Sequence, residues 1–94
     1  MSETARQAAA QDAILALLAA RRQGATICPS EAARALDPEG WRALMPLVRR
    51  AAGAMAAAGR IAVLQRGRPV EIETARGPIR LGLPADAKAG PGGE

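Results

Sequence analysis

The fold is decided within residues 48–65, which read VRRAAGAMAAAGRIAVLQ. In the first half, apolar side chains return at spacings of three and four, as on one face of a helix: Val48, Ala51, Ala52 and Met55. Gly59 then supplies the residue type that most often follows a helix end. From Ile61 the period changes to two, which is typical of a strand. The stretch therefore predicts a helix that ends at about Ala58 and leads directly into a β-strand.

Start and stop signals upstream predict two further helices. Residues 4–7 (Thr-Ala-Arg-Gln) have the spacing of a capping box, and the alanine-rich helix behind them is expected to run to Arg22. Residues 26–28 (Thr-Ile-Cys) are β-prone and form a candidate edge strand. Pro29 suits the first position of a second helix, because its missing N–H has no role there, and this helix is expected to run to Leu36.

Two interpretations are open for the segment between this second helix and the strand. In the first, Asp37 caps a helix whose pattern begins at Trp41, and Pro46 kinks that helix or starts it afresh. In the second, counted back from the helix end, the helix begins near Met45. Pro46 then lies in an unstrained first turn, and residues 37–44 form an inserted turn.

The C-terminal part predicts a small sheet. Gly67 with Pro69 signals a turn after the first strand. Apolar residues on both sides of Arg80 give a second alternating run over residues 79–81, and residues 66–78 form a long, basic connection to it. The fold class is therefore mainly α with a small antiparallel β-hairpin (α+β). We expect one domain over residues 1–83 and a disordered Gly/Pro/Ala tail over residues 84–94. The predicted core consists of Ile14, Leu18, Ile27, Leu36, Val48, Met55, Ile61, Val63 and Leu81.

This order of elements resembles the winged helix-turn-helix. Four segments are also similar to those of a small bacterial family of unknown function whose members are predicted winged helices: TICPSE at 26–31, WRALM at 41–45, GRI at 59–61 and GPIR at 77–80. Glu71 and Ile72 depart from the Asp-Pro that this family leads us to expect after Val70, which removes the basis for a tight turn there. The resemblance covers residues 10–83 and implies a fold without an activity.

Positive charge is concentrated in one part of the chain. Residues 41–80 hold eight arginines and two glutamates, a net charge of +6, whereas the whole chain carries +4. A concentrated positive field attracts polyanions such as nucleic acid or an acidic protein. A solvated, arginine-coated surface has the same composition, so charge alone does not decide between these interpretations.

Several classes of function lack the residues that they need. The chain has no histidine and one cysteine, which excludes histidine-dependent metal sites and triads and an internal disulfide. No Gly-rich phosphate loop follows a strand and the carboxylates are scattered, so we expect no enzyme, no cofactor and no metal. Without a signal-peptide pattern or a long apolar run, we expect a cytoplasmic protein with no membrane contact.

The candidate site consists of arginines on elements that a winged helix brings beside a duplex: Arg42, Arg49, Arg50, Arg66, Arg68 and Arg80. Arginine is the commonest reader of guanine, and basic wing tips contact phosphate. We therefore predict DNA binding, either sequence-tolerant or specific. The alternative is a protein-interaction or structural module without nucleic-acid binding, which the absence of lysine in residues 41–80, the inserted turn and the alanine-rich helix face favour. Trp41 either packs against the second helix or is exposed as an anchor. The sequence leaves the oligomeric state open.

Overall fold

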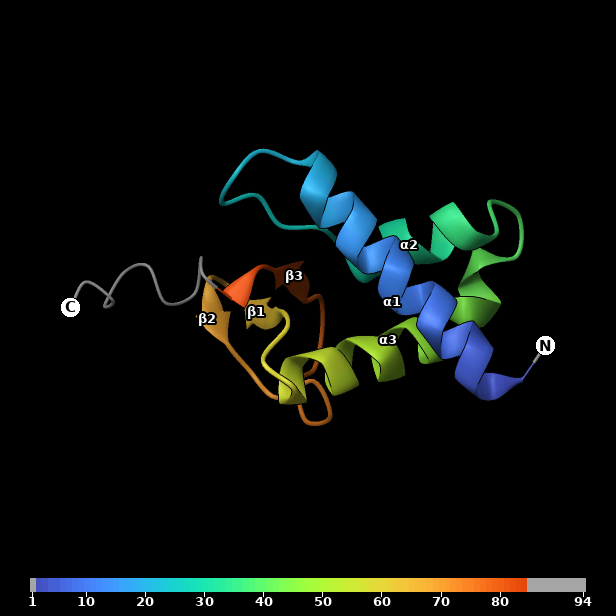
Figure 1. Cartoon of the computed structure of the whole chain (residues 1–94). Helices are drawn as coiled ribbons and strands as arrows, with labels where there is room; N and C mark the ends of the chain where they lie inside the picture. Colours follow the sequence, from blue (N-terminus) through green and yellow to red (C-terminus); the bar gives the residue numbers. More distant parts are fainter. Residues whose placement is uncertain (1, 85–94) are drawn as a thin grey trace.

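The computed structural model describes residues 2–84 and shows three helices followed by a three-stranded antiparallel sheet (Figure 1). The elements are α1 (Glu3–Ala20), α2 (Pro29–Leu36), α3 (Trp41–Ala57), β1 (Ala62–Gln65), β2 (Arg68–Pro69) and β3 (Arg80–Gly82). This topology is winged-helix-like and confirms the predicted α+β class. Apart from Pro84, the predicted tail lies outside the described residues. Within residues 2–84, no helix has the length and apolar character needed to cross a membrane.

The first helix begins one residue before the predicted capping box. Ser2 is extended and its hydroxyl accepts the N–H of Ala5 at 3.1 Å, so it caps a helix that starts at Glu3. Serine is at least as good a cap as threonine, which explains why the earlier residue takes this role. The helix ends at Ala20 and not at Arg22, because the chain is already extended at Arg21.

The second helix has the predicted bounds, and the third does not fit the second interpretation. Asp37 ends α2, and one of its carboxylate oxygens accepts the N–H groups of Glu39 and Gly40 to form a short turn. The third helix then starts at Trp41, as the first interpretation predicts, and continues through Pro46. Its N-cap is Gly40, so the predicted capping of this helix by Asp37 is wrong. A start near Met45 and an inserted turn over residues 37–44 are therefore wrong. Proline removes one backbone donor, but buried residues follow it directly in α3, and their packing holds the helix together.

The junction that decides the fold forms as the sequence predicts. Gly59 has φ +76°, the N–H of Arg60 donates to the carbonyl of Met55 at 2.8 Å, and the N–H of Gly59 donates to Ala56 at 3.0 Å. These two bonds form a Schellman motif, which ends the helix and turns the chain into β1.

The sheet has three strands, in the order β2-β1-β3, and not the two of the predicted hairpin. Gln65 pairs with Arg68, so Arg66 and Gly67 form a two-residue turn in which both residues have positive φ. The segment expected to be one long connection therefore contains a tight hairpin and a strand. Ile27 exchanges two backbone hydrogen bonds with Leu81, at 2.9 and 2.8 Å, which confirms the edge-strand prediction as a single bridge.

The hydrophobic core lies between the three helices and one face of the sheet. Of the predicted core residues, all are buried except Leu36, which is half-buried at the C-terminal end of α2. The predicted core list omitted Leu47, Ile79 and three alanines, all of which are buried. Ala51 and Ala52, on the predicted apolar face of the third helix, are buried as well. Trp41 is half-buried and packs against the edge of the core, as its packing interpretation requires.

Candidate nucleic-acid interface

We call residues 66–79, between β1 and β3, the wing. Four arginines surround one hollow at the wing. The hollow has a volume of about 1030 Å³ and is lined by Gln65, Arg66, Arg68, Pro69, Val70, Arg76, Gly77, Pro78 and Arg80. No carboxylate belongs to this set of described residues. We call this feature the wing hollow.

Local hydrogen bonds fix the shape of the wing hollow. The side-chain amide of Gln65 donates to the carbonyls of Arg76 and Pro78, at 2.5 and 3.2 Å, and so ties the end of the wing to β1. Two nitrogens of the Arg80 guanidinium each donate to Thr26 at 2.9 Å, one to the hydroxyl and one to the carbonyl. Two lining residues, Gln65 and Arg80, are thus held by contacts with segments that are distant in the sequence.

The tip of the wing holds an arginine in an unfavourable backbone conformation. Arg66 has φ +55° and is the one non-glycine residue with positive φ among residues 2–84. With Gly67 at φ +80°, it forms the type I′ turn that favours Asn-Gly. A left-handed conformation costs a residue with a side chain roughly 1–2 kcal/mol. The chain therefore keeps arginine where asparagine or glycine would fit the backbone better.

The wing arginines carry charge that no acidic side chain in the described part of the protein neutralises. Ion pairs within residues 2–84 are Arg21 with Glu31 and Arg50 with Glu3. The side chains at the open rim of the hollow are exposed and take part in neither pair: Arg66, Arg68 and Arg76.

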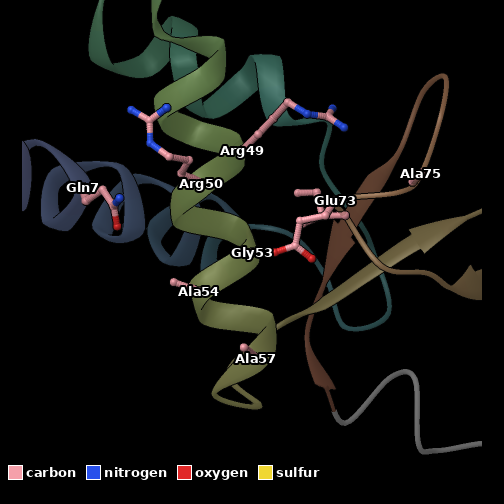
Figure 2. Close-up of a pocket in the computed structure, with 9 residues that line it drawn as sticks. Gln7, Arg49, Arg50, Gly53, Ala54, Ala57, Glu73 and Ala75 are labelled. Carbon is pink, nitrogen blue, oxygen red and sulfur yellow. The ribbon is translucent and has the colours of Figure 1, made fainter.

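The outward side of α3 carries two of the candidate arginines, and they point in different directions (Figure 2). Arg49 is half-buried and extends toward the side of the wing, whereas Arg50 extends toward α1. A guanidinium nitrogen of Arg50 lies 2.8 Å from a carboxylate oxygen of Glu3. This hydrogen bond holds the pKa of Glu3 below its usual value. Arg50 is therefore already engaged within the molecule.

Arg42 lies away from the other candidates. Its guanidinium carbon is 4.4 Å from the centre of the Trp41 ring, and that of Arg34 is 4.3 Å from the same centre. These cation–π contacts hold both arginines at the turn between α2 and α3. Figure 1 shows this turn at one end of the molecule and the sheet at the other. The structure thus brings together Arg66, Arg68 and Arg80 but not Arg42.

Sequence reasoning missed Arg76 as a site residue, although it lies in the same basic segment as Arg66 and Arg68. The sequence gives little indication of this position, because Arg76 is held at the hollow by a hydrogen bond from Gln65, eleven residues earlier. Arg34 was also missed, since its stacking on Trp41 depends on the angle between two helices. Among residues 2–84, no group of three or more possible metal-ligating side chains occurs.

Comparison with known proteins agrees with the resemblance noted in the sequence. A search of curated proteins finds no match. A family model described as protein of unknown function (DUF3253) matches residues 7–84, which include α2, α3 and the whole sheet. Because this match covers most of the sequence, the chain belongs to the DUF3253 family.

Proposed function

We propose that this protein binds the phosphate backbone of double-stranded DNA through the arginines of its wing hollow. The observation that carries the proposal is the gathering of Arg66, Arg68, Arg76 and Arg80 around one hollow with no carboxylate among its described lining residues. A concentration of positive charge of this kind attracts a polyanion. The planar guanidinium also matches phosphate oxygens with two parallel hydrogen bonds.

The backbone of the turn supports this role. Arg66 occupies a position where its conformation is costly, in the exposed turn of the hairpin. Backbone strain of this kind is found where a side chain serves a function. A turn selected for stability alone would carry Asn-Gly.

The absence of stacking residues favours a duplex over a single strand. Proteins that hold single-stranded nucleic acid stack the bases on aromatic side chains. Trp41 is the one aromatic residue in the sequence, and two arginines already lie on its ring. A duplex, which presents phosphates and keeps its bases stacked, needs no such platform.

The test is the salt dependence of binding to a short labelled duplex, measured by fluorescence anisotropy. If the four arginines that line the wing hollow and Arg49 each neutralise one phosphate, log affinity falls against log salt with a slope of roughly −4 to −5. Changing Arg66 and Arg68 together to Ala should reduce this slope by about 2. Arg6, at the start of α1, is the matched control, because Figure 1 places that end far from the sheet. The absence of any complex at low salt would refute the proposal.

A second candidate function is protein binding at the turn between α2 and α3. It is favoured by Trp41, whose ring is half-buried and flanked by the exposed Arg34 and Arg42. Tryptophan and arginine are the residue types that most often dominate binding energy at protein interfaces. In this case Trp41→Ala should abolish capture of a partner from cell extract, whereas DNA affinity, if any, should not change.

A further inference from the structure

The outward side of α3 is poor in groups that can read bases. The stripe of residues between the buried positions, which we call the outer stripe, consists of Pro46, Arg49, Arg50, Gly53, Ala54 and Ala57. Reading a base edge in the major groove needs side chains with hydrogen-bond donors or acceptors. Four of the six residues have none.

Only one of the two arginines in this stripe is available. Arg50 is paired with Glu3 and extends toward α1 (Figure 2). Arg42, one turn before the stripe, is stacked on Trp41. Arg49 is therefore the single side chain of α3 that can face a base edge on the side of the wing.

The wing itself lies against the C-terminal half of the outer stripe. A Cβ added to Gly53 would lie 3.0 Å from Cγ2 of Ile72, so the absence of a side chain at this position lets the wing approach the helix. Ile72, Glu73 and Ala75 help to line a hollow of about 630 Å³, together with Gln7 of α1 and every residue of the outer stripe except Pro46. Figure 2 shows Glu73 next to Gly53 on this side of α3.

This part of the wing is ordered by its own backbone and carries negative charge. The N–H groups of Thr74 and Ala75 both donate to the carbonyl of Glu71, at 3.2 and 2.9 Å, which forms one helical turn. Glu71 and Glu73 are exposed on it. Two carboxylates beside α3 repel the phosphates of any duplex that approaches closely enough for base reading.

We infer that the protein binds duplex DNA without sequence preference, because the wing packs Ile72 against Gly53 and places the carboxylates of Glu71 and Glu73 beside the C-terminal half of α3, where they keep that helix out of the major groove. This inference rests on the proposed function and specifies its substrate: phosphate backbone of any sequence. Contacts from the wing hollow supply the affinity, and a single arginine on α3 leaves little basis for discrimination.

The experiment measures the affinity of the purified protein for a panel of duplexes that differ in sequence and for a randomised duplex library carried through selection. We expect affinities within about tenfold of one another and no enriched motif. A specific protein instead binds its site about 10³-fold or more tighter than other DNA. An enriched motif with such a preference would overturn the inference and leave the proposed function in place. The absence of any complex at low salt would overturn both.

A variant tests the part played by the carboxylates. Changing Glu71 and Glu73 together to Gln should raise affinity several-fold for every duplex in the panel, since the repulsion does not depend on sequence. Glu39→Gln is the control, because Glu39 is an exposed carboxylate at the opposite end of α3. Unchanged affinity in the double variant would show that the wing turn does not lie beside the DNA, and the inference would be wrong.

Discussion

Replacing Arg66 with Asn should make the protein more stable and a weaker DNA binder. Arg66 has φ +55° in a type I′ turn, and an ordinary L-residue pays roughly 1–2 kcal/mol in this region. Asparagine tolerates the left-handed conformation and, with Gly67, forms the preferred pair for this turn. Recovering about half of the cost predicts a gain of ~0.5–1 kcal/mol in the free energy of unfolding.

The loss of binding follows from the same residue. One phosphate contact accounts for about 0.9 in the slope of log affinity against log salt. The variant should therefore show a smaller slope by about that amount, and lower affinity at low salt. Urea denaturation measures the first effect and fluorescence anisotropy the second, on the same preparations.

Arg68→Asn separates the two effects. Arg68 lies in β2, outside the positive-φ turn, and asparagine is unfavourable in strands, so this change should weaken binding without stabilising the fold. If Arg66→Asn does not stabilise the protein, the turn is not strained as we argue. If it stabilises the protein and leaves DNA affinity unchanged, the wing tip is not part of the interface.

Three other predictions concern the fold and its electrostatics. Gly53→Ala should increase stability by the ~0.5–1 kcal/mol typical of a helix interior only in the Ile72→Ala variant, where the nearby methyl group of Ile72 is gone. An equal gain with Ile72 present would mean that the wing does not contact α3. Leu18→Ala should cost ~2–4 kcal/mol in denaturant unfolding, because this side chain is 3% exposed, and a loss well under 1 kcal/mol would place it outside the core. The hydrogen bond from Arg21 is the chief reason that the pKa of Glu31 lies below its ordinary value near 4.5. Ionised Glu31 therefore stabilises the fold above pH 4.5, and this contribution is lost as the pH falls through the lowered pKa. Glu31→Gln should therefore lower stability at neutral pH and flatten its decline in acid, whereas an unchanged pH profile would contradict the pKa shift.

The features that the sequence predicts correctly depend on chemistry between neighbours in the chain. The start of α2 follows from Pro29 at its first position, and the end of α3 follows from a Schellman motif that needs only Gly59 and the residues beside it. Local signals left the start of α3 open between Trp41, where the helix begins, and Met45. Pro46 is a local signal for a break, and it is overridden by the burial of Leu47 and Val48 against other helices.

The same distinction between local and long-range chemistry applies to the candidate site. A glycine in an alternating pattern marks the turn at Gly67, so the arginines beside it were found. The engagement of Arg50 depends on Glu3, 47 positions away, and that of Arg80 depends on Thr26, 54 positions away. Nothing in the spacing of residues indicates either contact, because both follow from the packing of separate elements.

The wing is selected as the candidate interface by which arginines lack a partner within the protein, and not by the number of charges. Of the eight arginines in residues 41–80, four have a partner within the described molecule, in an ion pair, a side-chain hydrogen bond or a ring contact: Arg42, Arg50, Arg60 and Arg80. The other four have no such contact among residues 2–84, and three of these lie on the wing: Arg49, Arg66, Arg68 and Arg76. Three of the four arginines without such a partner therefore line one hollow, and the positive charge of this segment is not spread evenly over the surface. A polyanion that follows this field meets the wing before it meets α3, so affinity should depend on the wing arginines even if a variant of α3 were given side chains that read bases.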